Sequence, residues 1–348
     1  MQRSSYRLSR TGSLHRLRLV SDEIGPPAAS EIAIAVRAIG LNFADVFTVL
    51  GLYGAAPRNN CIPGIEFSGV VVDCGKNVTR VGVGDRVMGS IRFGAYTSRL
   101  NIDERYVLPI PSGWSFEEGA SFIVQSLTAY YALFTLGNLK PNQTVLIHSA
   151  AGGVGIYAVR IAKLLGAYTI GTVGSTSKVH LAEEEGCDAV ILRGGRFPDD
   201  LRAALEGRGL DLVLDSIGGK VQKQSFEMLA TSGRLVAYGI SEFASHRATP
   251  DFLMLARRFL AMPRYHTLTL IKSNKSILGF NLIWLYDRAD MLSRFLGEIQ
   301  ALQLPNPHVG VVLPFDRLKE AVRLLQSGTT TGKVVVSVQQ VSDLLKSY

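Results

Sequence analysis

The chain has few cysteines. Only Cys61, Cys74 and Cys187 occur among its 348 residues, and they are too few and too far apart to form a disulfide framework or a zinc cluster. The basic amino terminus is not followed by an apolar segment like that of a secretory signal peptide, so export is not expected. These absences predict a reducing environment, and we expect the protein to be cytoplasmic.

Long hydrophobic runs are also missing. Nearly half of the residues are hydrophobic, yet no apolar run reaches the length of a membrane span, so we expect no membrane partner. The formal net charge is +8, but no motif that reads nucleic acid accompanies it, and we expect no nucleic-acid partner. The basic residues are scattered apart from one amino-terminal group, made of Arg3, Arg7, Arg10, Arg16 and Arg18. A modest basic excess of this kind suits anionic ligands such as nucleotide phosphates, or an acidic partner surface.

The length favours two domains rather than one. Short, β-branched strands are predicted over 31–38, 69–73 and 86–88, with glycine turns between them. Such closely punctuated strands are typical of a compact, barrel-like β domain. The end of the chain is predicted to fold back onto this domain, with a strand, a helix and a strand over 309–313, 315–327 and 333–338.

After Ser115 the pattern changes. Helical spacing over 116–136 leads to an apolar strand over 144–148, and helices and strands then alternate. The predicted helices cover 153–165, 177–185, 199–205 and 221–230, and the predicted strands cover 168–172, 189–192, 211–215 and 234–238. Because these strands are apolar on both faces, the pattern predicts an α/β fold with a doubly wound, parallel-sheet nucleotide-binding domain.

Two further predictions concern the edge of this sheet. Residues 243–264 are less regular and are expected to form helices that extend the edge or cover a site. The strand over 234–238 is expected to be the last of the sheet, which would make it an edge for pairing between copies of the chain.

A glycine-rich turn carries the strongest functional signal. The predicted strand over 144–148 leads directly into Ser149 and the turn, and a helix follows. A dinucleotide fingerprint requires this context, with a tight turn, bare backbone beside the pyrophosphate and helix N–H groups that face the anion. A lone glycine triplet would be weak evidence, but within a β-α-β series it is strong. We expect the pyrophosphate to be held by Ala150, Gly152, Gly153, Val154 and Gly155, with Ala150 in place of the first glycine.

The segment after the second strand indicates which nucleotide is bound. Folds that prefer NAD place an acid there, which accepts hydrogen bonds from the ribose hydroxyls, whereas residues 171–178 contain none. Gly174 lies at this end, and Ser175, Lys178 and Arg193 could instead donate to a 2′-phosphate. The prediction is NADPH. The alternative is that Lys178 and Arg193 are ordinary solvated side chains.

Several segments together resemble the medium-chain dehydrogenase/reductase superfamily along nearly the whole chain. They are Tyr6–Leu14, Gly40–Asp45, Leu50–Gly54, Pro63–Gly69, Gly84–Gly89 and Leu127–Leu133. Within that superfamily the chain is similar to zinc-independent quinone oxidoreductases and to the enoylreductase domains of polyketide synthases, and residues 276–282 resemble the quinone oxidoreductases and the VAT-1 group. The resemblance implies a discontinuous GroES-like catalytic domain over 1–118 and 286–348, and a Rossmann NADPH-binding domain over 119–285.

The chain departs from the zinc alcohol dehydrogenases of the superfamily. Where those enzymes carry a cysteine and a histidine for the catalytic metal, this sequence has Asn42 with Phe43, and Ile65 before Glu66. These residues are poor or impossible zinc ligands. We therefore expect no metal, and alcohol oxidation assisted by a Lewis acid is disfavoured.

The resemblance also suggests roles in hydride transfer to an enoyl thioester. Tyr53 and Lys178 match positions that have been considered as proton donors, with phosphate binding the favoured role for Lys178. Asn42 is expected to donate a hydrogen bond near the nicotinamide ribose or the substrate carbonyl, with turn stabilisation as the alternative. The remaining residues predicted to lie along the cofactor are Thr128, Tyr238, Phe280 and Lys333.

Four other polar residues are interpreted as structural. Asp45 and Glu66 are expected to form hydrogen bonds or an ion pair within the β domain, since no metal gives them another task. His148 and His180 are a strand-end and a helix histidine, which are more often structural than catalytic.

Three functions fit these features. The first is an NADPH-dependent enoyl reductase acting on an acyl-carrier-protein-bound or small enoyl substrate, with other polyketide synthase domains as partners. The second is an NADPH quinone oxidoreductase that acts on free small molecules. The third is an NADPH-binding protein without catalysis. The sequence leaves open the acyl group, the fate of the enolate, whether the protein is free-standing or an excised megasynthase domain, and the oligomeric state.

Overall fold

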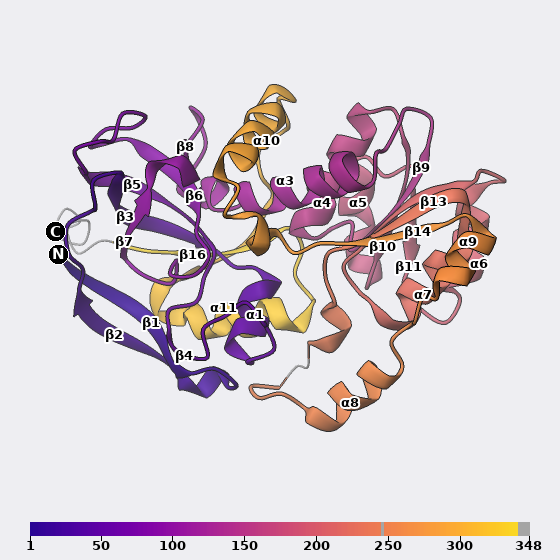
Figure 1. Cartoon of the computed structure of the whole chain (residues 1–348), viewed down its shortest axis with the longest axis horizontal. Helices are drawn as coiled ribbons and strands as arrows, with labels where there is room; N and C mark the ends of the chain where they lie inside the picture. Colours follow the sequence, from indigo (N-terminus) through magenta and orange to yellow (C-terminus); the bar gives the residue numbers. More distant parts are fainter. Residues whose placement is uncertain (245–246, 340–348) are drawn as a thin grey trace.

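The structure, a computed structural model, describes residues 1–244 and 247–339, which form two lobes with a cleft between them (Figure 1). The β lobe contains a seven-stranded sheet in the order β15-β16-β3-β5-β6-β8, with β7 paired to β3, and a three-stranded sheet in the order β2-β1-β4. Their bounds are β1 (Gln2–Arg10), β2 (Leu17–Glu23), β3 (Glu31–Gly40), β4 (Asn59–Cys61), β5 (Glu66–Cys74), β6 (Arg86–Ser90), β7 (Arg99–Asp103), β8 (Val107–Pro109), β15 (Val309–Pro314) and β16 (Lys333–Ser337).

The end of the chain completes this lobe. β16 runs antiparallel to β3, β15 runs parallel to β16, and α11 (Leu318–Ser327) joins them. The predicted return of the tail to the β domain is therefore confirmed. α11 packs beside α1 (Phe43–Val49), and the apolar residues Leu318, Ala321 and Val322 on its inner face are buried.

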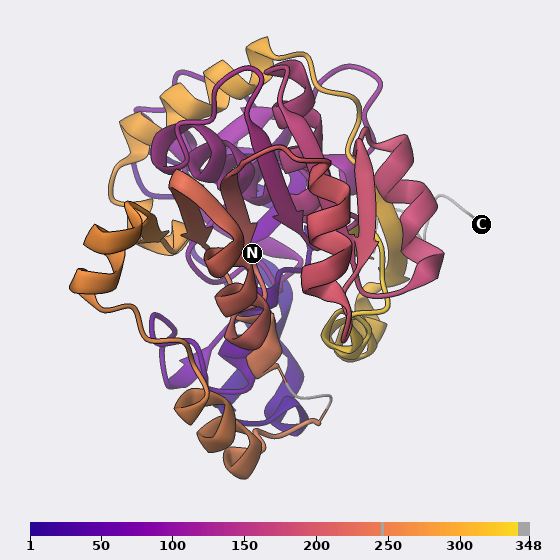
Figure 2. The same cartoon turned by 90° about the vertical axis from the view of Figure 1, so that its right-hand side faces the viewer.

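The second lobe is a six-stranded parallel sheet in the order β11-β10-β9-β12-β13-β14. Its elements are β9 (Thr144–His148), α4 (Gly153–Leu164), β10 (Tyr168–Val173), α5 (Val179–Glu184), β11 (Ala189–Leu192), α6 (Phe197–Leu205), β12 (Leu210–Asp215), α7 (Gly219–Met228), β13 (Leu229–Ala237) and β14 (Ser276–Gly279). Figure 2 shows the sheet with helices on its faces. The predicted doubly wound fold is confirmed, and the chain order reverses at β9, where such folds open a ligand crevice.

The edge of the sheet differs from the prediction. β14 pairs in parallel with β13 from Arg234 to Ala237, so β14 rather than the strand at 234–238 is the last strand. β13 also begins directly after α7, at Leu229. β14 escaped the sequence analysis because four residues are too few to show a period.

Several other elements, short and long, were likewise not predicted. They are β1, β2, β4, β7, β8, α1, α9 (Thr267–Ser273) and α10 (Ala289–Ala301). The segment at 243–264 does contain a helix, α8 (Phe252–Leu260), but the sheet is extended by β14 and not by this helix.

The stretch from Phe116 to Leu136 joins the two lobes. It comprises α2 (Phe116–Gly119), α3 (Ile123–Tyr130) and a π-helical end at Tyr131–Leu136. With a mean hydropathy of 1.2 it is long and apolar enough to cross a membrane by length and composition, so the expectation that no run reaches that length is wrong. Most of it is buried inside the protein, where α3 packs against α4 and α10. Such burial is what a core helix shows.

Gly64 fixes the chain where it enters β5. Its φ is +92°, and a Cβ there would lie 2.3 Å from a ring carbon and 2.8 Å from the backbone nitrogen of the fully buried Tyr96. Backbone hydrogen bonds from Ala95 and Tyr96 to Gly64 and Pro63 hold these two segments together. Glycine is therefore required both by conformation and by space.

We predict that Gly64→Ala lowers the free energy of unfolding by about 3 kcal/mol or more, because left-handed backbone and overpacking add. The matched control is Gly84→Ala, with φ +96° and nothing within 4 Å of the new Cβ, which should cost about 1–2 kcal/mol. Chemical denaturation of the two variants measures the difference. Equal losses would show that Tyr96 does not constrain Gly64.

Candidate active site

A cavity of about 780 Å³ lies between the lobes. One wall comes from the β lobe and includes Asn42, Phe47 and Tyr53, while another comes from α3. A third part is formed by residues after the strands β9 to β14, at the carboxyl ends of the parallel sheet, and residues at the end of α11 and the start of β16 complete the lining. This is the position at which doubly wound sheets bind their ligands.

The glycine turn lies at the centre of that cavity. Gly152 donates its N–H to the Ser149 carbonyl (2.8 Å) and α4 begins at the next residue. A Cβ on Gly155 would lie 2.1 Å from the Ser149 carbonyl oxygen, so only glycine lets the helix pack so closely on the turn. The first N–H groups of α4 have no partner within the helix and can bind an anion.

Gly152, Gly153, Val154 and Gly155 all line the cavity as expected, but Ala150 does not. Ala150 is fully buried behind the turn, where its N–H donates to the Thr172 carbonyl (3.0 Å). Ala150 therefore supports the turn from the hydrophobic core, because the tight turn directs its side chain away from the cavity.

Residues 174–178, which follow β10 directly, include no acid. Two cations lie at this side of the cavity. Gly174, Lys178 and Arg193 line the cavity there. The Lys178 ammonium donates to the carbonyls of Gly328 (2.6 Å) and Thr330 (2.7 Å), and Arg193 donates to the Ser149 hydroxyl (3.0 Å). Burial and the charge of Arg193 lower the pKa of Lys178. An anion bound beside this pair would offset the repulsion between the two cations and raise the pKa of Lys178 again.

Ser175 is placed differently from the prediction. It is exposed, its hydroxyl exchanges a hydrogen bond with the Ser177 hydroxyl (2.9 Å), and it does not line the cavity. As the residue that precedes a short 3-10 turn, it faces solvent rather than the cleft.

A buried polar network closes the cavity wall on the β-lobe side. The Lys333 ammonium contacts the Glu66 carboxylate (2.6 Å) and the Asn42 amide oxygen (2.8 Å), and Gln125 donates to that same oxygen (2.6 Å). Asn42 in turn donates to the Gly40 carbonyl (3.1 Å). Asn42 and Lys333 line the cavity as expected, but the Asn42 amide is held by protein groups and does not present a free donor to the cleft.

The network does not fit a catalytic zinc. Asn42, Phe43 and Ile65 all line the cavity where metal ligands would be needed. The nearby Glu66 carboxylate is already neutralised by a fully buried ammonium, and a divalent cation beside Lys333 would be repelled.

The residues interpreted as structural have that role. Glu66 forms the ion pair with Lys333 and also accepts from the Val124 N–H (3.0 Å). Asp45 accepts from the Asn42 N–H (2.8 Å) and caps α1. His148 is fully buried between the hydroxyls of Thr172 and Ser225, and burial lowers its pKa to about 3.

His180 lies on the surface of α5. Its ring is 3.2 Å from Glu184, one turn further along the helix, and is mostly exposed. It has no contact with the cavity.

Tyr53 lines the cavity from the β-lobe side. Its hydroxyl donates to the Asn281 amide oxygen (2.8 Å), so the bond joins the loop after α1 to the segment after β14. Burial raises the pKa of Tyr53 to about 12, which keeps the phenol protonated at neutral pH. The ring packs edge-on against Phe93.

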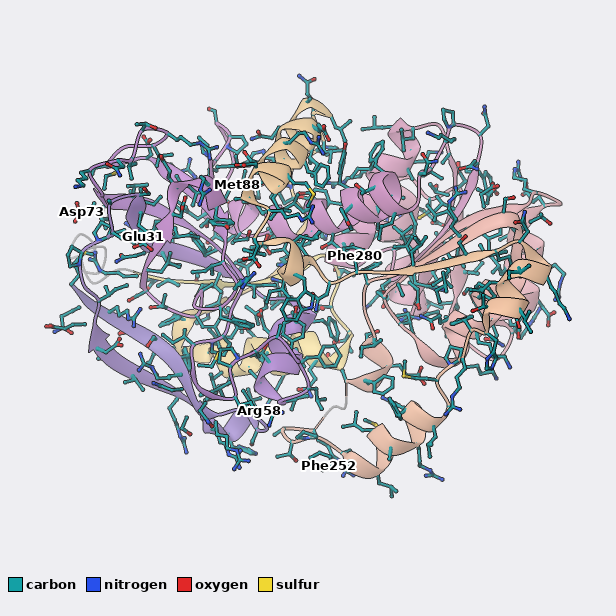
Figure 3. The ribbon with its side chains drawn as sticks, in the orientation of Figure 1. Glu31, Arg58, Asp73, Met88, Phe252 and Phe280 are labelled. Carbon is teal, nitrogen blue, oxygen red and sulfur yellow. The ribbon has the colours of Figure 1, made fainter. Side chains whose placement is uncertain are left out.

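The remaining predicted residues also line the cavity. Tyr238 and Phe280 both line the cavity, with their rings 6.2 Å apart, and Phe280 also packs on Tyr131. Thr128 lines the cavity too, although its hydroxyl proton is donated to the Val124 carbonyl within α3 (2.6 Å). Figure 3 shows Phe280 at the centre of the molecule, where the lobes meet.

Comparison with known proteins agrees with this architecture. Residues 28–112 match the family described as alcohol dehydrogenase GroES-like domain, and residues 153–293 match the family described as zinc-binding dehydrogenase. The human synaptic vesicle membrane protein VAT-1 homolog is 31% identical over 331 residues, which cover 93% of this chain and 84% of that protein. The chain belongs to the zinc-independent medium-chain dehydrogenase/reductase family. It is therefore an oxidoreductase by family, with the GroES-like and Rossmann lobes of that family.

Other relatives in the family differ in what they do. The reducing polyketide synthase rdc5 of Metacordyceps chlamydosporia is 35% identical over 346 residues, which cover 96% of this chain but only 14% of the synthase. The CurK enoyl reductase structure has a TM-score of 0.82 at 28% identity, covering 97% of this chain and 100% of that one. The Escherichia coli quinone oxidoreductase complexed with NADPH has the same TM-score, identity and coverage.

Some residues of the site were not predicted. Asn281 follows β14, and its importance was hidden because that strand was not recognised. Ser149 and Ser216 follow β9 and β12 and line the cavity. The rule that ligands bind at the carboxyl ends of parallel strands would have found both.

Asp45 should make stability depend on pH. Burial, as the largest cause, raises its pKa to about 7, although the Asn42 N–H and Lys333 act against this and Glu66 adds to it. The pKa in an unfolded chain is about 4. Between about pH 4 and 7 the folded protein therefore holds a proton that the unfolded chain has lost, and this contribution to the unfolding free energy falls as the pH rises.

We predict that Asp45→Asn, which keeps an oxygen for the Asn42 N–H, removes this part of the pH dependence. Urea denaturation of both proteins at several values between about pH 4 and 7 measures it. The wild type should lose stability relative to the variant as the pH rises. Parallel curves would mean that Asp45 does not titrate in this range.

Proposed function

We propose that the protein is an NADPH-dependent enoyl reductase that delivers hydride to the β-carbon of an α,β-unsaturated thioester without a metal. The observation that carries this proposal is one cavity that joins the glycine turn and two half-buried cations to the protonated phenol of Tyr53. The structural similarity to the CurK enoyl reductase supports it, as does the similarity to reducing polyketide synthases.

The Rossmann side of the cavity suits a phosphorylated dinucleotide. The pyrophosphate would lie on the N–H groups of Gly153, Val154 and Gly155. Lys178 and Arg193 would bind the 2′-phosphate, since both line the cavity and residues 174–178, which follow β10, include no acid. Bound there, NADPH would supply the hydride.

The β-lobe side suits the second half of the reaction. When the β-carbon gains a hydride, the electron pair of the C=C bond moves toward the thioester oxygen and leaves an enolate, which must take a proton at its α-carbon. Tyr53 would donate that proton from its hydroxyl, and solvent would then reprotonate the phenolate. Asn281 holds this hydroxyl across the cleft until the substrate takes its place.

Removal of the Lys178 charge should affect NADPH more than NADH. We predict that Lys178→Ala raises the KM for NADPH at least about tenfold, because one charge-assisted contact to the 2′-phosphate is lost. The KM for NADH, which lacks that phosphate, is the internal control and should change little. Equal effects on both nucleotides would refute the phosphate assignment and leave Lys178 as a link to residues 328–330.

Removal of the Tyr53 hydroxyl should affect proton transfer. We predict that Tyr53→Phe lowers the rate of reduction of a crotonyl thioester about 100-fold, as expected when a general acid is lost. Deuterium incorporation at the α-carbon from heavy water reports which face is protonated. The control is Tyr6→Phe, which also loses a hydroxyl, one that donates to the Asp316 carbonyl (2.8 Å) between residues that do not line the cavity. An unchanged rate and stereochemistry in Tyr53→Phe would exclude direct donation.

The assay also separates the alternatives. The similarity to the Escherichia coli quinone oxidoreductase favours free quinones as a second candidate. Turnover of quinones without reduction of enoyl thioesters would replace the proposed function with that one. Tight NADPH binding with no hydride consumption from any of these acceptors would instead indicate a binding protein.

A further inference from the structure

α8 has its apolar face turned outward. Asp251 caps its start by accepting from the Met254 N–H (3.0 Å), and no residue of the helix is buried. Phe252, Ala256 and Phe259 follow helical spacing and lie on one side with Leu253 and Leu260. The four large side chains Phe252, Leu253, Phe259 and Leu260 are each between 67% and 75% exposed. An outward apolar stripe of this kind marks a surface that binds a partner.

The helix is held in place at the cleft. In the segment just before it, the Ala248 carbonyl accepts from the Leu14 N–H (2.9 Å), and the Arg247 carbonyl accepts from the Gln326 side chain (2.9 Å). Both partners belong to the β lobe, whereas the chain of α8 continues into the Rossmann lobe. Figure 1 shows α8 at the lower margin, below the elements of both lobes.

The opposite side of α8 faces the active site. Arg258 lines the cavity, together with Ala244 just before the helix. The same short helix therefore has one side on the substrate cavity and the other, apolar side on the outer surface. In Figure 3 Phe252 and Arg58, which lies on the loop after Tyr53, are both at this lower margin.

The charge around the stripe is positive. Residues 247–264 contain the four arginines Arg247, Arg257, Arg258 and Arg264 against one acid, Asp251, which is paired with Arg247. A twofold contact with a second copy would bring like charges together, because each patch would face itself. An acidic partner fits this surface better.

We propose that the outer face of α8, made of Phe252, Leu253, Phe259, Leu260 and Arg257, docks an acidic carrier domain that presents the enoyl thioester on its phosphopantetheine arm. The proposal rests on the proposed enoyl reductase function. Docking here places the arm at the cavity mouth beside Arg258, whose charge suits the phosphodiester of the arm. A small free substrate would need no such surface.

The test compares one acyl group in two forms, crotonyl-loaded acyl carrier protein and free crotonyl-pantetheine. Leu260→Ser and Arg257→Glu should each raise the KM for the carrier-bound form about tenfold, as truncation of a central contact does. The KM for free crotonyl-pantetheine should stay within about twofold of the wild type. Leu268→Ser and Lys272→Glu, on the exposed face of α9, are matched controls that should change neither value.

A second measurement needs no variant. Raising the salt concentration should raise the wild-type KM for the carrier-bound form only, since the charges on this surface are exposed and screened. If the wild type reduces both forms but the α8 variants behave like the α9 controls, the docking proposal is wrong and the enoyl reductase function stands. If neither form is reduced, the proposed function itself fails. Loss of self-association or of binding to anionic lipid vesicles in the α8 variants, with unchanged KM for the carrier, would assign the surface to a second copy or to a membrane instead.

Discussion

The buried ion pair between Lys333 and Glu66, both in the β lobe, is the interaction around which the polar wall of the cavity is built. A charge taken out of water is costly unless it is paired and hydrogen-bonded. Lys333 starts β16 near the end of the chain, and Glu66 starts β5, 267 residues earlier. Because each charge needs the other, the tail must return to the β lobe, and with Asn42 and Gln125 the pair also brings α1 and α3 to one point.

The residue before Lys333 extends this effect to the nucleotide side. Gly332 donates its N–H to the Ala151 carbonyl in the glycine turn (2.8 Å). The next residue, Lys333, has its side chain buried in the β lobe. Lys178 adds two bonds to the carbonyls of Gly328 and Thr330. The stretch from Gly328 to Lys333 thus connects the glycine turn, Lys178 and the buried polar network. It links the two lobes that enclose the cavity.

The same network explains why the metal chemistry of relatives does not transfer to this chain. An ammonium in contact with Glu66 supplies the positive charge that the carboxylate needs, and the side chains facing the cleft beside it are an amide and apolar groups. What the cleft offers instead is a protonated phenol on one side and two cations on the other. In the proposed reaction the phenol would supply the proton, while the cations would hold the nucleotide that supplies the hydride.

The sequence alone determined the fold class, the glycine turn and the absence of zinc ligands. These features depend on local pattern, since apolar alternation defines a buried strand and a turn after it must be built from small residues. The parallel sheet and the positions of Gly152 to Gly155 follow from such patterns. Short strands such as β14 carried too little pattern to be recognised, and with β14 the edge of the sheet and Asn281 were lost.

Only the tertiary structure decided which polar groups face one another. No spacing in the sequence relates Lys333 to Glu66 or Tyr53 to Asn281, because these contacts join segments far apart in the chain. It also decided that Ala150 and Ser175 lie outside the cavity, and that the apolar face of α8 points outward. Local chemistry fixes what a residue can do, while burial and partners are properties of the folded whole.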